Sequence, residues 1–128
     1  MEILTSNGIT VSVITQYLPT HSNPRERKFI FGYQIRIENG TAQTVQLLHR
    51  YWHIWDADNT VKEVDGEGVV GVQPILAPGE SYAYTSFCNL ACEIGKMRGK
   101  YLMIQLDTKN TFEVQIPEFK MVAPFRLN

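Results

Sequence analysis

Apolar and polar residues alternate along most of the chain with a period of two, which is the pattern of β-strands that bury one face. The clearest run is Phe29–Glu38, where five large apolar residues share one face and mostly polar residues share the other. Further strands are expected over Ile9–Tyr17, Val45–Asp56, Thr60–Val64, Ser81–Ser86, Lys100–Asp107 and Thr111–Ile116. No window carries the i, i+3, i+4, i+7 apolar spacing of an amphipathic helix, so little helix is expected.

Short turn-forming sequences separate these strands. They stand at Asn39-Gly40, Asp58-Asn59, Pro78-Gly79 and Lys109-Asn110. Both residues of the first pair tolerate a positive φ, which favours a tight turn there. The polar segment His21–Arg27 is expected to be a surface loop, and Pro117 is expected to end the last strand because proline cannot donate to a β-ladder. Many short strands cut by turns predict an all-β fold, an antiparallel β-sandwich or barrel.

Two expectations concern large apolar side chains. Trp52, on the strand Val45–Asp56, is taken to share a face with Leu48 and Ile54 and should lie in the core. The segment Phe119–Phe125 is too apolar for a free tail. We therefore expect it to pack as an edge strand, either within the chain or on a second copy in a homodimer.

Length and charge restrict the class of protein. The chain has 128 residues, which suits one domain spanning residues 1–128. Twelve Lys and Arg residues stand against 13 Asp and Glu residues, for a net charge of −1, which removes the electrostatic ground for binding nucleic acid or anionic membranes. No apolar run approaches the roughly 20 residues of a membrane span, and no secretion signal follows Met1. We expect a cytoplasmic protein, in which Cys88 and Cys92 are free thiols rather than a disulfide across a very short loop.

Residues 66–71 match the pattern G-x-G-x-x-G through three glycines: Gly66, Gly68 and Gly71. In a dinucleotide-binding fold this pattern joins a strand to a helix, but residues 72–75 are not helical in character and the chain has no βαβ pattern. Two interpretations remain. The loop could form a nest of backbone N–H groups for a phosphate or pyrophosphate, although Asp65 and Glu67 would repel one. Alternatively, the glycines only allow unusual backbone angles in a structural loop.

Other candidate chemistry is sparse. His49 and His53 are four residues apart on a strand, which separates their Cα atoms by about 13 Å and makes a shared metal ion difficult. Together with Tyr51 and Trp55 they predict a partly exposed aromatic face. Neither a zinc-binding cysteine pattern nor a G-x-S-x-G nucleophile is present. Arg98 is the one basic residue that we single out as a candidate ligand contact. The sequence assigns no catalytic residue, metal site or cofactor.

Several separated segments resemble the ApaG domain family, and together they cover nearly the whole chain. They are Tyr17-Leu18-Pro19, residues 33–39, residues 45–48 with Arg50 and Trp52, Asp56-Ala57, Glu63-Val64, residues 66–71, Gln73-Pro74, residues 78–80, residues 84–86, residues 97–101, Ile116-Pro117 and Phe119. This chain departs from common family residues at three positions, with Glu67 for proline, His49 for a small residue and Phe87 for glycine.

The resemblance implies an immunoglobulin-like or fibronectin type III-like β-sandwich, in agreement with the period-two pattern. It also implies a link to cobalt and magnesium efflux in bacteria, which describes a phenotype, and protein contacts made by the similar domain in eukaryotic proteins. For the glycine motif it implies a pyrophosphate-binding role, carried here by Gly66, Gly68 and Gly71.

Two functional hypotheses follow. The first is a non-enzymatic binding module that presents its loops and aromatic face to an unidentified protein partner and affects divalent cations indirectly. The second is a pyrophosphate- or nucleotide-binding protein that uses the loop Gly66–Gly71. Basic residues gathered around that loop would favour the second hypothesis, whereas an exposed apolar patch would favour the first.

Overall fold

The alternating pattern forms nine β-strands in residues 1–124, the part of the chain that the structure, a computed structural model, describes. The strands are β1 (Glu2–Ser6), β2 (Ile9–Tyr17), β3 (Phe29–Asn39), β4 (Val45–Asp56), β5 (Val61–Glu67), β6 (Ile75–Leu76), β7 (Ser81–Leu90), β8 (Ile94–Gln105) and β9 (Thr111–Val122). Two short 3-10 turns, η1 (Pro19–His21) and η2 (Pro24–Glu26), lie in the expected surface loop between β2 and β3. Neither is long and apolar enough to cross a lipid bilayer, and the described residues contain no other helix.

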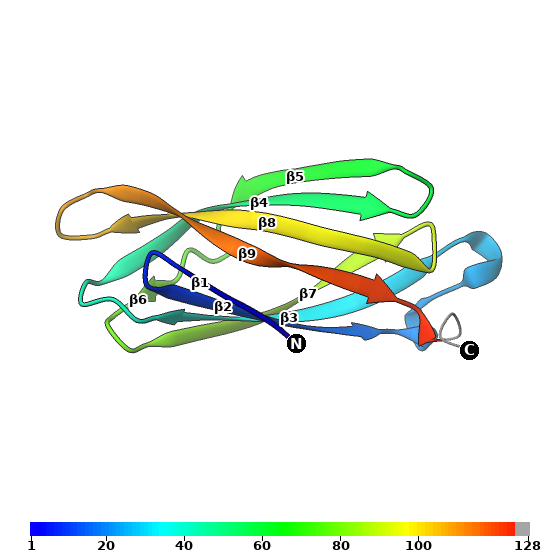
Figure 1. Cartoon of the computed structure of the whole chain (residues 1–128), viewed down its shortest axis with the longest axis horizontal. Helices are drawn as coiled ribbons and strands as arrows, with labels where there is room; N and C mark the ends of the chain where they lie inside the picture. The colour runs from blue at the N-terminus through cyan, green and yellow to red at the C-terminus, as the bar shows by residue number, and fades with distance from the viewer. Residues whose placement is uncertain (125–128) are drawn as a thin grey trace.

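The strands form two antiparallel sheets that pack face to face (Figure 1). The first sheet has the order β1-β2-β3-β7, and the second has the order β5-β4-β8-β9 with β6 paired to β4. If β2, β3, β4, β5, β7, β8 and β9 are lettered A, B, C, C′, E, F and G, the sheets become A-B-E and C′-C-F-G. This is the arrangement of a fibronectin type III-like sandwich and confirms the predicted fold class.

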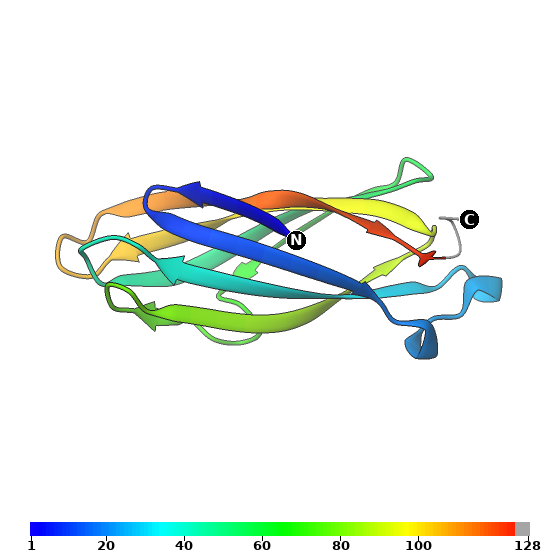
Figure 2. The same ribbon diagram turned by 60° about the horizontal axis from the view of Figure 1, so that its bottom comes forward.

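One flank of the sandwich is closed by the two ends of the chain. β1 and β2 pack against β9, although about 100 residues separate them in sequence, and Figure 2 shows the N-terminal hairpin beside the C-terminal strand. Side-chain bonds tie this contact, because the Asn7 amide donates to the Glu113 carbonyl over 2.7 Å and the Gln115 N–H donates to Ser6 Oγ over 2.9 Å. The first strand is thereby fixed to the last.

The core lies between the sheets, and Trp52 stands in it as expected. Its side chain is 3% exposed. Its ring meets Tyr33 and Phe119 edge to face, at centroid distances of 5.6 and 5.9 Å. A bulge in β4 between Leu47 and His49 changes one detail of the prediction: Leu47 is fully buried, whereas Leu48 is only half-buried. The extra residue of the bulge reverses the alternation on one side of it.

Pro117 does not end the last strand, contrary to the prediction. β9 continues to Val122, and the register against β8 shifts between the pairs Met97–Phe119 and Gly99–Ile116. Two residues of β9, Pro117 and Glu118, therefore lie opposite one residue of β8. A bulge on an edge strand accommodates proline because no neighbour needs its missing N–H. The expected edge strand over Phe119–Phe125 is present up to Val122, and Phe125 lies outside the described residues.

Asn39 also differs from its predicted role, because it has no positive φ and its side chain is fully buried. Its amide donates to the Gln43 and Leu76 carbonyls over 2.8 and 3.0 Å, and its carbonyl oxygen accepts bonds from the Thr41 backbone and hydroxyl. The residue thus fastens the β3–β4 loop to β6 instead of forming a tight turn. A buried amide is tolerated here because its polar atoms have partners.

Candidate functional site

The outer face of the second sheet carries an ordered array of charged and aromatic side chains, which we call the striped face. Residues paired across neighbouring strands point to the same side of a sheet. The outward rows across β5, β4 and β8 are Val61–Trp55–Lys96, Glu63–His53–Arg98, Asp65–Tyr51–Lys100 and Glu67–His49–Leu102. The two middle rows therefore each place an acid on β5, a ring on β4 and a base on β8, whereas the outer rows carry Val61 on β5 and Leu102 on β8.

The rings of β4 form the partly exposed aromatic face that the sequence predicts, and bases of β8 lie over two of these rings. The Lys96 ammonium lies 5.4 Å from the centre of the Trp55 ring, and the Lys100 ammonium lies 5.8 Å from the centre of the Tyr51 ring. These are cation–π distances. Tyr51 and Trp55 are half-buried, so each ring contributes contact area while it remains reachable.

Acids on both sides hold this array in place. Lys100 Nζ lies 2.8 Å from Glu113 of β9, and this hydrogen bond raises the pKa of the Lys100 amine. Lys96 Nζ lies 4.0 Å from Glu118. A hydrogen bond between Tyr51 and the Glu63 carboxylate raises the pKa of the Tyr51 hydroxyl. These exposed pairs add little stability, but they fix the directions of long side chains.

Arg98 stands at the centre of the striped face. It is exposed, and within residues 1–124 it forms no ion pair. Together with Tyr51, His53, Lys100 and Glu118 it lines an open groove that crosses β4, β8 and β9 and reaches Leu4 of β1. The guanidinium is therefore a cation that a partner can reach.

The glycine loop lies elsewhere. Gly66 is part of β5 and belongs to the inward row with Arg50, whereas Arg98 belongs to an outward row. Gly68 and Gly71 have φ angles of +61° and +77°, as expected for glycines that allow unusual backbone angles. The structure thus keeps the three glycines together along the chain and places Arg98 on the other side of the sheet.

Hydrogen bonds within the loop leave its carbonyl oxygens facing a cation, the Arg50 guanidinium. The N–H of Gly68 donates to the Leu48 carbonyl over 3.0 Å, and Val69 and Val72 donate to each other's carbonyls over 2.8 and 3.0 Å. Arg50 Nη1 donates to the carbonyls of Glu67 and Gly68, each over 3.0 Å. Several amides of the loop are therefore already bonded, and its carbonyls bind a guanidinium. An anion-binding nest requires the opposite polarity.

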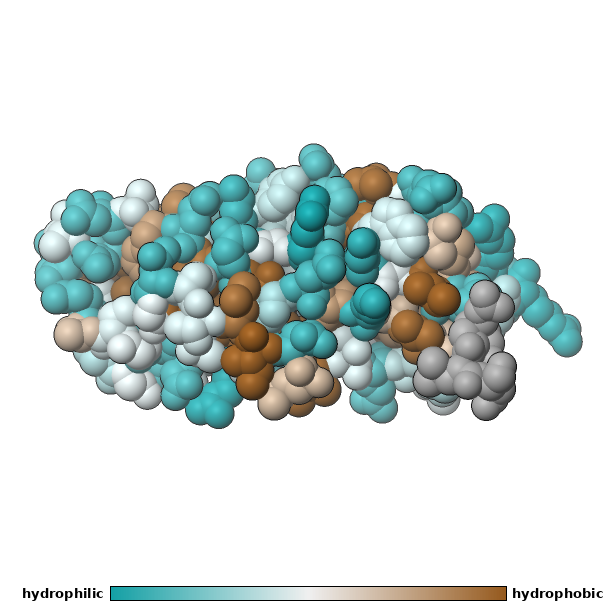
Figure 3. Space-filling view, in the orientation of Figure 1, coloured by the Kyte–Doolittle hydropathy of each residue, from teal (hydrophilic) through white to brown (hydrophobic). Residues whose placement is uncertain are grey.

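Apolar side chains project from the same connection. Val70, Val72 and Ile75 are 60%, 44% and 55% exposed. The face of the molecule in Figure 3 shows apolar residues as separate patches on a mostly hydrophilic surface. This connection is a second region that a protein partner could cover.

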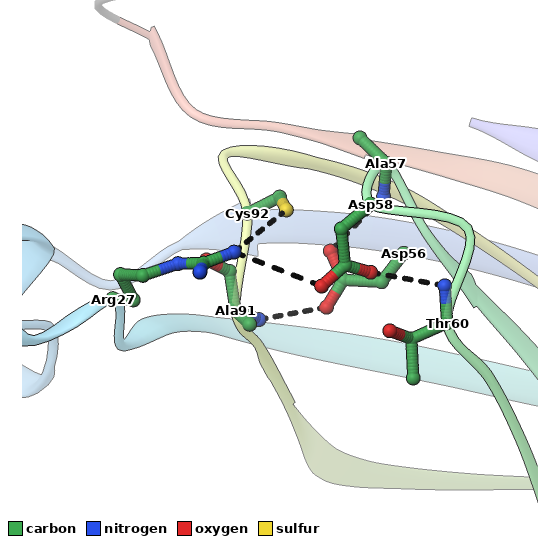
Figure 4. A network of polar contacts seen from close by, with 7 residues as sticks. All are labelled: Arg27, Asp56, Ala57, Asp58, Thr60, Ala91 and Cys92. Carbon is green, nitrogen blue, oxygen red and sulfur yellow. Dashed lines mark hydrogen bonds and ion pairs between the residues drawn. The ribbon is translucent and has the colours of Figure 1, made fainter.

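A cluster of Asp56, Asp58 and Cys92 escaped the sequence analysis (Figure 4). Their ligand atoms all lie within 4.8 Å of one another. Asp56 accepts bonds from the backbone N–H groups of Ala57 and Ala91 over 3.0 and 2.7 Å. Cys92 is 34 residues from Asp58 in sequence, so no local spacing could reveal the cluster.

Arg27 already supplies a cation to this cluster. Its Nη2 lies 3.6 Å from Asp58 and 3.8 Å from Cys92 Sγ. Hydrogen bonds from Thr60 lower the pKa of Asp58, while burial raises the pKa of the Cys92 thiol. The group therefore holds three loops together, since each of its donor atoms already has a partner among the described residues.

The remaining sequence candidates are placed as follows. His49 contacts Asp65, its neighbour diagonally across from β4 to β5, and His53 lies further along the same face. Cys88 and Cys92 are free thiols. Burial raises the pKa of the Cys88 thiol to about 11, which keeps it protonated and unreactive.

Comparison with known proteins places the chain among close relatives. Residues 19–105 match the model of the ApaG domain family. The ApaG protein of Brucella canis is 45% identical over 119 residues, which cover 93% of this chain and 91% of that protein. The ApaG protein of Brucella anthropi is 47% identical over the same length and the same shares. A crystal structure of an ApaA protein from Bordetella pertussis superposes with a TM-score of 0.87 at 44% identity, covering 91% of this chain and 94% of that one.

Proposed function

The chain belongs to the ApaG domain family, and on that premise we propose that it is a non-enzymatic binding module that recognises a protein through the striped face. The observation that carries the proposal is the ordered array of exposed charges beside half-buried aromatic rings on a rigid sheet. Aromatic and arginine side chains contribute most of the binding energy at protein interfaces. A rigid sheet loses little conformational entropy when it binds.

Buried reactive groups support the non-enzymatic part of the proposal. Burial raises the pKa values of the Cys88 thiol and of the Tyr84 and Tyr101 hydroxyls. These groups are therefore held in their neutral forms, whereas nucleophiles and general bases need a pKa near the working pH. We place the effect on cobalt and magnesium with the partner rather than with a metal bound by this chain.

A pull-down tests this proposal. Tagged wild-type protein should retain a partner from a lysate of its own cells, and Arg98→Glu should reduce the retained amount at least tenfold. The matched control is Arg36→Glu, which reverses an exposed arginine on the outer face of the other sheet. Among the described residues Arg36 bonds only to Ser81 Oγ. Equal retention by all three proteins would contradict recognition through the striped face.

The pyrophosphate-binding alternative ranks second because of the bonds within the glycine loop. A carboxylate about 5 Å from a phosphate charge costs roughly 3 kcal/mol at an effective dielectric constant near 20. We therefore expect no pyrophosphate or nucleotide binding tighter than about millimolar, or about −4 kcal/mol. Isothermal titration of the wild type and Glu67→Pro measures this directly. Micromolar binding by the wild type would reverse the ranking.

A further inference from the structure

We infer that the striped face binds a second copy of this chain, with a two-fold axis that runs along β4. This inference rests on the proposed function, because it names the partner of the same face. It follows from the order of charges across the sheet: in two consecutive outward rows an acid, a ring and a base stand side by side. The rows are Glu63–His53–Arg98 and Asp65–Tyr51–Lys100.

Symmetry makes such a face complementary to itself. When two copies meet face to face, a two-fold axis parallel to β4 exchanges the sides of the sheet but keeps each residue at its level along the strand. β8 of one copy then lies over β5 of the other. Arg98 faces the second copy's Glu63, Lys100 faces its Asp65, and each pair occurs twice. An axis perpendicular to the strands would place β8 over β8 and set the bases against one another.

The rings along β4, in the middle of the striped face, fit the same axis. Residues of β4 lie on the axis, so Tyr51, His53 and Trp55 each meet their own counterpart, and aromatic side chains pack well in such pairs. Sheets that pack face to face hold their strands within about 30° of one another, which keeps the rows in register near the centre. The carboxylates Glu113 and Glu118 of β9 stay at the rim, outside the overlap of β5 with β8.

Arg98 is the residue on which the contact depends most. Lys96 and Lys100 already have acidic partners within their own chain, whereas Arg98 has none among the described residues. A carboxylate from a second copy would supply one in a partly desolvated setting, where charged hydrogen bonds are strongest.

The contact area sets the expected affinity. Seven residues of β4 at about 3.3 Å each, and three strands about 4.8 Å apart, give a flat face of roughly 23 by 14 Å. That is about 320 Å² on each copy and about 640 Å² in total, below the roughly 1,200 Å² at which stable interfaces begin. We therefore expect a weak, transient dimer, with a dissociation constant of tens of micromolar that rises with salt.

Sedimentation velocity tests the inference, with circular dichroism to verify that every variant is folded. Wild-type protein at 5–200 µM (a range set by the expected micromolar affinity) should dimerise in 50 mM salt, and 500 mM salt should weaken the dimer at least tenfold. Arg98→Glu and Glu63→Arg should each be monomeric, because each places like charges opposite one another. An equimolar mixture of the two variants should dimerise, since both contacts are then attractive, and so should the double variant. Arg36→Glu should behave as wild type.

Two results would overturn the inference. One is a wild type that stays monomeric at 200 µM in 50 mM salt, and the other is a dimer that Arg98→Glu leaves unchanged. A monomeric wild type whose lysate partner is still lost on Arg98→Glu would refute the second copy as occupant and leave the proposed function standing. Conversely, a dimer that follows the charge pattern while no other protein is retained would support the second copy as the partner.

Discussion

Replacing Trp52 with alanine should lower the free energy of unfolding by about 3–5 kcal/mol. The indole is 3% exposed and sits between the rings of Tyr33 and Phe119. Burial of about 200 Å² of aromatic surface at about 25 cal/mol per Å² gives about 5 kcal/mol. Residual burial in the unfolded chain reduces this by roughly 10–40%, and each lost edge-to-face contact adds back about 0.5–1.5 kcal/mol.

Urea unfolding followed by far-ultraviolet circular dichroism measures this loss. With a slope of about 1.5 kcal/mol per molar urea, the midpoint should fall by about 2–3 M. Trp55→Ala is the matched control, because that ring is half-buried on the outer face of the same strand and should cost about 1 kcal/mol or less. If Trp52→Ala is unfolded without urea, Trp52→Phe should show a smaller loss. A Trp52→Ala midpoint within 0.5 M of the wild type (a shift of about 0.8 kcal/mol at that slope) would refute the reasoning.

Further predictions concern close packing, alkaline pH and thiol reactivity. A methyl group at Gly99 would lie 2.2 Å from the Tyr51 carbonyl oxygen, so Gly99→Ala should cost at least about 2 kcal/mol; an unchanged melting temperature would contradict the packing described. Burial raises the pKa of the Tyr101 hydroxyl in the folded protein. The neutral Tyr101 side chain therefore contributes its full stability below the unfolded pKa near 10, and this contribution is lost as the pH rises above that value. The phenolate absorbance of Tyr101 at 295 nm, identified as the part that Tyr101→Phe lacks, should therefore appear only as the circular dichroism signal is lost. Ionisation of Tyr101 while the protein is still folded would contradict this. At pH 8 Ellman's reagent should label Cys92 in the folded protein, and it should label Cys88, whose pKa is raised to about 11, only in denaturant. Cys92→Ser should abolish the reaction of the folded protein, whereas Cys88→Ser should not. Labelling of folded Cys92→Ser would contradict the burial of Cys88.

The sequence predicts strands well where the two faces of a strand differ. The range Phe29–Glu38 matches β3 to within one residue, and Val45–Asp56 matches β4 at both ends. β1 was not predictable in this way, because Ile3 and Leu4 are both substantially exposed and the strand shows no clear alternation. The continuation of β9 past Pro117 depends on a bulge in an edge strand. The alternation of residues along β9 does not predict the sheet order that makes β9 an edge.

The candidate site was predictable in part for the same reason. The period of two places Tyr51, His53 and Trp55 on one face of β4, and Arg98 could be singled out as a reachable base. The stripes themselves also require the pairing of β4 with β5 and with β8, which joins residues 6 to 18 and 41 to 53 positions apart along the four rows. The turn Asp58-Asn59 indicates the first pairing, because a hairpin joins strands that follow one another, whereas no turn or alternation along the chain identifies β8 as the other neighbour of β4.

The closed flank has a consequence for biosynthesis. A ribosome releases β1 and β2 long before it has made β9, their packing partner. Until the last strand leaves the exit tunnel, the apolar inner side of the first sheet has no complete cover, and a nascent chain in that state is prone to aggregate or to engage a chaperone. Native folding is therefore expected only after β9 has left the exit tunnel, with the millisecond-to-second rate typical of proteins dominated by distant contacts.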